Sequence, residues 1–151
     1  MKIAIIGVGS VGSAVATAVK GTGLAHEIVL YDRDGIRARA AAEDLGHASA
    51  FSYDIQLTAA SNYRAIRGCE IVIIASGANQ KPGETRMDLL QKNTAVIQDI
   101  IPRVMEVVDA KKVKIIVVTN PLDVMVMLAQ KLSKLPATRV TGTGTLLDSA
   151  R

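Results

Sequence analysis

The sequence has few residues that could stabilise a protein by any means other than a hydrophobic core. It contains one cysteine, Cys69, no tryptophan and only 3% aromatic residues. A single cysteine excludes an internal disulfide and a cysteine metal cluster, so we expect a reducing, cytoplasmic compartment and no metal. No apolar run reaches the ~18 residues of a membrane span. The short apolar stretch at the amino terminus is interrupted by glycines, which is not typical of a signal peptide.

The charge pattern also excludes classes of partner. The formal charge is only +4, and the 18 basic residues are mixed with 14 acidic ones rather than gathered in a stripe. This pattern disfavours binding to nucleic acid or to a membrane surface. With 151 residues, of which 49% are hydrophobic, the chain is long enough for one domain with a real core.

Short apolar segments rich in β-branched residues alternate with longer segments of helical periodicity. The predicted strands are residues 2–6, 27–31, 55–59, 71–76, 113–119 and 139–141. The predicted helices are 10–20, 35–49, 85–110, 121–134 and 146–151. Runs 71–76 and 113–119 are typical of strands buried on both faces, and Pro102 should bend or split its helix. The alternation predicts an α/β fold, a doubly wound parallel sheet (Rossmann) with strand order 3-2-1-4-5-6 and helices on both faces.

A glycine motif of the form G-x-G-x-x-G follows the first strand directly. Gly7 would permit the tight turn, Gly9 the close approach of a pyrophosphate, and Gly12 the packing of the next helix on the strand. Asp32 ends the second strand, where its carboxylate would accept hydrogen bonds from the ribose hydroxyls and repel a 2′-phosphate. This predicts NAD as the cofactor, although a surface-turn aspartate is the alternative, and the neighbouring Arg33 leaves room for NADP.

Three further segments follow the ends of later strands. Residues 76–86 contain the glycines and proline of a lid-like loop, and Arg86 at its far end either polarises a substrate carbonyl or is a solvated surface arginine. Asn120 precedes a proline, so it either orients a ligand or marks a turn. Asp148 and Arg151 share one helix face, as a surface ion pair or as an orienting acid and a carboxylate-binding arginine.

Together the segments GVGSVG, VLYD, SGANQKPGETRMDLLQKN, VVTNPLD and GTGTLLDSAR resemble the L-lactate/malate dehydrogenase family along the whole chain. The resemblance implies catalytic roles for Arg86 and Asp148. It implies substrate contacts through Gln80, Arg86, Asn120 and Arg151. The NAD contacts that it implies are Gly7, Gly9, Val11, Gly12, Asp32, Arg37, Tyr63, Gly77, Ala78, Val118, Asn120 and Thr143.

Gln80 distinguishes the two branches of this family. Malate dehydrogenases of this kind carry an arginine there, which pairs with the second carboxylate of oxaloacetate. A neutral Gln80 leaves room for the methyl group of pyruvate, so the loop looks like that of a bacterial-type L-lactate dehydrogenase. Asp99 departs from the family pattern, which usually has Ser or Thr at this position near the nicotinamide.

The catalytic histidine of the family would lie beyond Arg151, and neither His26 nor His47 is placed to replace it. We therefore expect residues 1–151 to be the dinucleotide-binding domain with the start of the next helix, and the second, catalytic domain to be absent. The open alternatives are a nearly inactive NAD-binding half of a lactate dehydrogenase, half of a complemented split enzyme, a malate dehydrogenase relative, and a non-catalytic dinucleotide-binding module.

The expected truncation also predicts self-association. Apolar surface on the helix from Gly35, on residues 97–108 and near residues 146–147 should be exposed.

Overall fold

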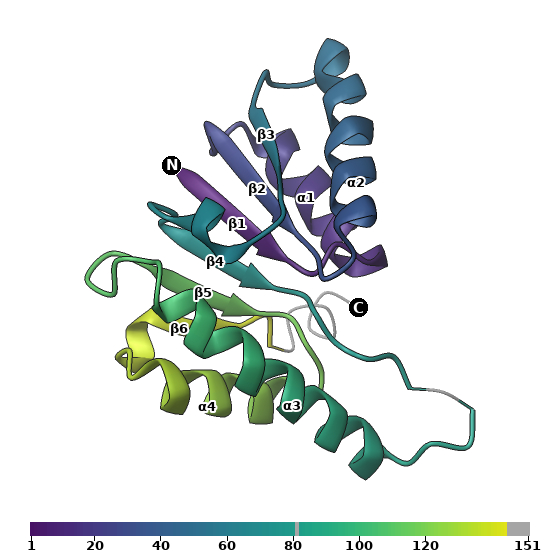
Figure 1. The fold of residues 1–151 in the computed structure, drawn as a ribbon, viewed down its shortest axis with the longest axis vertical. Coiled ribbons are helices and arrows are strands. Elements are labelled where there is room, and N and C mark those ends of the chain that lie inside the picture. Colours follow the sequence, from purple (N-terminus) through teal and green to yellow (C-terminus); the bar gives the residue numbers. More distant parts are fainter. Residues whose placement is uncertain (81, 145–151) are drawn as a thin grey trace.

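A six-stranded parallel sheet forms the centre of the computed structural model, which describes residues 1–80 and 82–144. Its strand order is β3-β2-β1-β4-β5-β6, and every neighbouring pair is parallel (Figure 1). The predicted fold class and strand order are confirmed. The strands are β1 (Lys2–Ile6), β2 (Glu27–Tyr31), β3 (Gln56–Ala60), β4 (Ile71–Ile74), β5 (Lys114–Val117) and β6 (Val140–Gly142).

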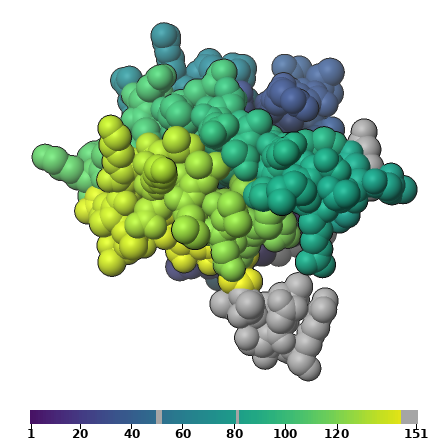
Figure 2. Space-filling view, turned by 90° about the horizontal axis from the view of Figure 1, so that it is seen from below, coloured from purple at the N-terminus to yellow at the C-terminus, as the bar shows by residue number. Residues whose placement is uncertain are grey.

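In the described part of the chain, two helices lie on each face of the sheet. This is expected because the connections are right-handed and the strand order runs outward from β1 in one direction and from β4 in the other. Helices α1 (Ser10–Thr22) and α2 (Gly35–His47) pack on one face. Helices α3 (Arg86–Met105) and α4 (Leu122–Ser133) pack on the other. In Figure 2, which views the molecule from below, α3 and α4 make up most of the visible face.

The two cores follow from the alternation of side chains along each strand. On the α3 and α4 side, the buried strand residues are Ala4, Ile6, Val29, Ala60, Val72, Ile74, Ile115, Val117 and Val140. They pack against the apolar stripe of α3, which contains Ile97, Ile100, Ile101 and Val104. Residues 97–108 are therefore not the exposed apolar surface that the sequence predicts, because their apolar side chains turn toward the sheet, where Ile97, Ile100, Ile101, Val104 and Val108 are buried. On α2, by contrast, Ile36 is 80% exposed.

The opposite face is covered unevenly. Helices α1 and α2 pack over β1, β2 and β3, where Ile5, Ile28 and Leu30 are fully buried. On the same face of β5, Ile116 and the following Val118 are only half-buried in the described part of the chain. The prediction that residues 113–119 are buried on both faces is therefore wrong for these residues.

Several boundaries differ from the predicted ones. Helix α3 ends at Met105 rather than at residue 110. It is not split at Pro102, which lies in its last turn, so only three helical residues follow the position at which proline removes a hydrogen bond. Three short 3-10 segments, η1 (Ala48–Phe51), η2 (Tyr63–Ile66) and η3 (Ala137–Arg139), were not predicted. The predicted helix 146–151 lies outside the described residues. Within those described, no helix is long and apolar enough to cross a membrane.

Candidate functional site

The carboxyl ends of the parallel strands bring the predicted cofactor residues to one edge of the sheet. Gly7 follows β1, Asp32 follows β2, Gly77 follows β4 shortly after its end, and Asn120 follows β5. Thr143 comes directly after β6, and its N–H donates to the carbonyl oxygen of Val117 at 3.3 Å. In open sheets of this kind, ligands bind at this edge where the strand order reverses, here between β1 and β4.

The turn between β1 and α1 is tightly packed and requires glycine at two positions. Gly7 has φ +92°, and its N–H donates to the Tyr31 carbonyl oxygen at 2.8 Å. A Cβ atom at Gly7 would lie 2.4 Å from the Ser76 nitrogen, and one at Gly12 only 1.8 Å from the Gly7 carbonyl oxygen. Because Gly7 has no side chain, the turn can pack directly against the Ser76 backbone. Because Gly12 has none, α1 can pack directly against the Gly7 carbonyl.

The amino terminus of α1 has the properties of a phosphate site. Gly9 is the N-cap residue, no side chain caps the helix, and the first turn holds no acidic residue. A Cβ atom at Gly9 would meet nothing within 4 Å, so the outer side of the turn is open. Val11, in the first turn of α1, is exposed. Backbone N–H groups and the helix dipole at such an end attract anions, so this geometry fits a pyrophosphate.

Asp32 is held in place beside this turn. Its Oδ2 accepts a hydrogen bond from the Val8 N–H at 2.8 Å, and its Oδ1 accepts one from the Asp34 N–H at 2.9 Å. The side chain is 11% exposed, and a terminal nitrogen of Arg37 lies 3.9 Å away. Each carboxylate oxygen keeps a free lone pair. The group is thus pre-oriented to accept the ribose hydroxyls, and its negative charge disfavours a 2′-phosphate.

Two tyrosines lie next to Asp32 on the same half of the edge. The rings of Tyr31 and Tyr63 have centroids 4.4 Å apart. Burial, and then the neighbouring Tyr31, raise the pKa of Tyr63 well above its usual range, so its hydroxyl is protonated at neutral pH. Asp99, which pairs with Arg103 at 2.8 Å, also raises this pKa. Asp99 therefore lies close enough to Tyr63 to act on its hydroxyl.

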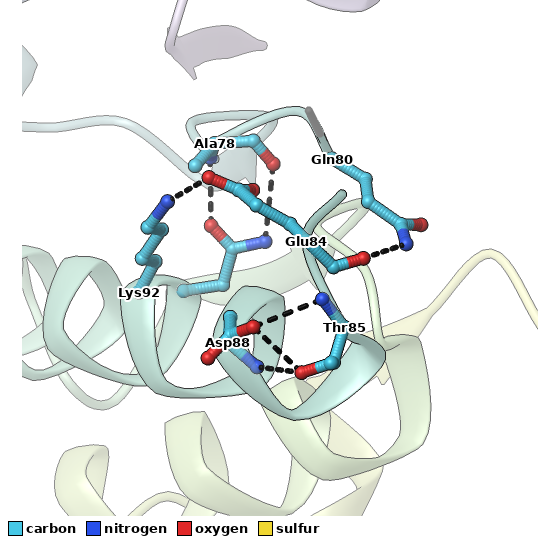
Figure 3. A network of polar contacts seen from close by, with 7 residues as sticks. Ala78, Gln80, Glu84, Thr85, Asp88 and Lys92 are labelled. Atoms are coloured by element: carbon cyan, nitrogen blue, oxygen red, sulfur yellow. Dashed lines mark hydrogen bonds and ion pairs between the residues drawn. The ribbon is translucent and has the colours of Figure 1, made fainter. Parts of the chain in front are cut away.

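A buried asparagine on α3 connects the loops that follow β4 and β5. Figure 3 shows polar contacts around the loop after β4, including those of Ala78, Gln80 and Glu84. The Oδ1 of Asn93 accepts from the Ala78 N–H at 2.7 Å, and its Nδ2 donates to the carbonyl oxygens of Asn120 at 2.6 Å and Ala78 at 3.4 Å. The Thr119 hydroxyl donates to the Ser76 carbonyl oxygen at 2.7 Å. The sequence interpretation did not name Asn93 or Thr119 as site residues. A polar residue on the apolar stripe of α3 was the available signal.

The loop carrying Gln80 and Arg86 extends from the end of β4 to the start of α3, away from the sheet (Figure 1). Gln80 donates through Nε2 to the Glu84 carbonyl oxygen at 2.8 Å, and the Glu84 carboxylate pairs with Lys92. Arg86 is exposed in the first turn of α3. The predicted substrate residues of this loop therefore lie on its outer part, and Asn120 lies at the sheet.

The predicted capping box at the start of α3 is confirmed. The Asp88 N–H donates to the Thr85 hydroxyl oxygen at 3.2 Å, and the Thr85 N–H donates to Asp88 Oδ2 at 2.9 Å. The Thr85 hydroxyl also donates to Asp88 Oδ2 at 2.7 Å, and this bond, followed by the one from the Thr85 N–H, lowers the pKa of the Asp88 carboxyl. Because the folded-state pKa is lowered, the ionised cap stabilises the helix at neutral pH, and this stabilisation is lost as pH falls through that pKa.

The remaining titratable candidates lie elsewhere. His26 precedes β2 at the opposite edge, where its Nδ1 accepts from the Met1 amine at 2.8 Å, and His47 ends α2. Burial raises the pKa of the Cys69 thiol to about 12, so this thiol is protonated at neutral pH. The described residues contain no cluster of three metal-ligating side chains. Asp148 and Arg151 lie outside the described residues.

Comparisons with known proteins agree with this geometry. Residues 1–142 match the model of the lactate/malate dehydrogenase NAD-binding domain. The chain is 43% identical over its full length to an L-lactate dehydrogenase of Thermus aquaticus, of which it covers 48%. It is 42% identical to one of Zea mays, with 99% of this chain and 42% of the relative covered. The chain thus spans about half the length of these curated relatives.

The solved structures give the same result. The minor L-lactate dehydrogenase of Enterococcus mundtii superimposes with a TM-score of 0.91 at 36% identity, over 97% of this chain and 46% of that one. The lactate dehydrogenase MGS-M5 from a Medee basin deep-sea metagenome library superimposes with a TM-score of 0.89, also at 36% identity, over 99% of this chain and 47% of that one. Together with the glycine turn, the oriented Asp32 and the strand order, these matches show that the chain belongs to the lactate/malate dehydrogenase family and carries its NAD-binding domain.

Proposed function

We propose that the chain binds NAD along the carboxyl edge of the sheet and discriminates against NADP. The observation that carries this proposal is the position of the Asp32 carboxylate, oriented by two backbone N–H groups, next to the open amino terminus of α1. In this arrangement the pyrophosphate lies on the N–H groups after Gly9 and the adenosine ribose on Asp32. Tyr63 and Arg37 flank the adenosine half, while Gly77, Ala78, Val118 and Thr143 belong to the β4–β6 half.

Replacing Asp32 with serine tests this proposal. Because hydrogen bonds to a charged group contribute about 1.5–3 kcal/mol, we expect the variant to bind NAD roughly 10- to 100-fold more weakly. NADP binding should weaken less or improve, since the repelling charge is gone and Arg37 remains. Titration calorimetry with both dinucleotides measures the two dissociation constants.

The matched control is Asp54→Ser, which removes the same charge from an exposed residue before β3. It should leave both affinities unchanged. Equal affinity of the wild-type chain for NAD and NADP, or an Asp32→Ser variant that binds NAD as well as the wild type, would contradict the proposal.

We further propose that the chain is the cofactor half of an L-lactate dehydrogenase rather than a malate dehydrogenase. When bound, NAD would supply the hydride acceptor for the carbon that carries the substrate hydroxyl. In this proposal Arg86 polarises the substrate carbonyl, Asn120 orients the substrate, and Arg151 binds its carboxylate. Gln80 is neutral, so it favours a substrate with a methyl group over one with a second carboxylate. Asp148 orients the histidine that the catalytic domain supplies.

The isolated chain should oxidise lactate at a negligible rate, because neither His26 nor His47 lies at the site. Mixing it with the carboxyl-terminal half of the Thermus aquaticus relative should restore NAD-dependent lactate oxidation in excess of malate oxidation.

Sedimentation velocity of the chain alone and in the mixture tests the proposed self-association through the exposed face of α2, on which Ile36 lies.

Each competing hypothesis has its own outcome in this experiment. Substantial turnover by the chain alone contradicts the inactive-half proposal, and preferred turnover of malate assigns the chain to the other branch of the family. NAD binding without any activity in the mixture favours a non-catalytic dinucleotide-binding module. A single monomeric species at tens of micromolar (an order-of-magnitude working range) contradicts self-association.

A further inference from the structure

Asn93 is a polar side chain in the buried stripe of α3, four residues before Ile97. It is only 1% exposed. Its carboxamide uses its acceptor oxygen on the Ala78 N–H and its nitrogen on the Asn120 and Ala78 carbonyl oxygens, at 2.7, 2.6 and 3.4 Å. One side chain thus joins the loop after β4 to the loop after β5.

Few side chains satisfy both loops at once. A carboxamide has one acceptor oxygen and two N–H donors on a planar group. An aspartate has the same shape but, when ionised, only acceptors, so it would face the Asn120 carbonyl oxygen without a proton between them. The approach is also close, because a Cβ atom at Gly77 would lie 3.3 Å from Asn93 Oδ1 and 2.8 Å from a methyl carbon of Thr119.

The two loops lie on the half of the edge opposite to Asp32. The glycine turn after β1 is central in the strand order, Asp32 follows β2 on one side, and Ala78 and Asn120 follow β4 and β5 on the other. A dinucleotide that places its pyrophosphate at the central turn and its adenosine ribose on Asp32 therefore extends its second nucleoside over these two loops.

We infer that Asn93 is a positioning residue for the nicotinamide half of the site. It acts through other residues, because it holds the Ala78 backbone, from which the loop with Gln80 and Arg86 begins, at a set position relative to Asn120. This inference rests on the proposed binding of NAD. The linkage between the loops can also be measured without any ligand.

The ligand-free measurement is amide hydrogen exchange at Ala78, whose N–H donates to Asn93. In the Asn93→Ser variant, which is too short to reach both loops, exchange at Ala78 should accelerate by about tenfold or more while amides in β1 keep their protection. An unchanged rate at Ala78 would overturn the linkage. Asn93→Ser removes side-chain volume and adds no charge, so it remains testable if the aspartate variant does not fold.

The ligand measurement compares NAD with ADP, which retains the adenosine and both phosphates but lacks the nicotinamide riboside. We expect Asn93→Asp and Asn93→Ser to weaken NAD binding by about tenfold or more and to leave ADP binding within about twofold. An equal loss for both ligands would mean that Asn93 only maintains the fold and would overturn the positioning role. A wild-type chain that binds neither ligand overturns the proposed function and this role together, while exchange at Ala78 still reports the linkage.

A pH series gives a signature that a purely structural residue does not produce. In Asn93→Asp, burial raises the pKa of the introduced carboxyl, and its protonated form regains one O–H donor for the Asn120 carbonyl. NAD affinity of this variant, relative to the wild type, should therefore recover as pH falls from about 8 to about 5. The matched control, Gln98→Glu, makes the same amide-to-carboxylate change at an exposed position of α3 and should show no such trend. Absence of recovery in Asn93→Asp would contradict the proposed hydrogen-bond role.

Discussion

Replacing Gly12 with alanine should destabilise the chain strongly. The new Cβ atom would lie 1.8 Å from the Gly7 carbonyl oxygen and 2.9 Å from its carbonyl carbon. Gly7 cannot move away easily, because its N–H is bonded to the Tyr31 carbonyl oxygen and Ser76 packs against it. Either α1 or the turn must shift, and both carry the proposed cofactor site.

The expected cost is about 3 kcal/mol, at the upper end of the range for overpacked positions. For a chain of this length, such a loss lowers the midpoint of thermal unfolding by roughly 6–12 °C, measured by circular dichroism. The control is Gly21→Ala in the same helix, where a Cβ atom meets nothing within 4 Å. It should stabilise the chain by about 0.5–1 kcal/mol. A Gly12→Ala variant that unfolds at the wild-type temperature would contradict the close packing of α1 against the turn.

Gly9→Ala should have the opposite effect to Gly12→Ala: the chain should keep its stability and bind NAD more weakly. Gly9 has φ −78° and ψ −166°, which any residue adopts, and no atom lies within 4 Å of its added Cβ. The unliganded chain therefore tolerates the methyl group. A pyrophosphate that rests on the first turn of α1 does not, because the methyl group holds it away from the backbone N–H groups.

Loss of one charge-assisted hydrogen bond costs about 1.5–3 kcal/mol, so NAD affinity should fall roughly 10- to 100-fold in titration calorimetry. The midpoint of thermal unfolding without ligand should change by only about 2 °C, which corresponds to under ~1 kcal/mol. ADP binding should weaken in parallel with NAD, which distinguishes this effect from that of Asn93. Unchanged affinity for both ligands would mean that the phosphates do not pass over Gly9.

The fold was predictable in detail where the pattern is local. Strands 2–6 and 27–31 and the start of α2 coincide with the predicted boundaries, because β-branched runs end in glycine or Asp32 and helices begin at identifiable caps. The end of α3 was placed five residues too late, because the apolar spacing continues to Val108 whereas the helix ends one turn after Pro102. Periodicity alone does not show how far a helix survives a proline.

Burial was less predictable than secondary structure. The sequence predicts exposed apolar surface on residues 97–108, yet the apolar side chains of this segment pack in or against the core. Ile116 was expected to be covered, yet the helices of its face lie over β1–β3. The sequence of a strand shows which of its side chains are apolar. Whether a helix covers them depends on which face of the sheet each connecting helix lies on.

The sequence by itself determined the crossover order and the chemistry of the glycine turn and Asp32, because each depends on a backbone conformation or a charge at a set distance along the chain. Only the tertiary structure decided that Asn93 and Thr119 hold the loops after β4 and β5. These contacts join segments 15 to 43 residues apart. Their partners are backbone carbonyl and N–H groups, which every residue carries, so no side-chain pattern along the chain marks them.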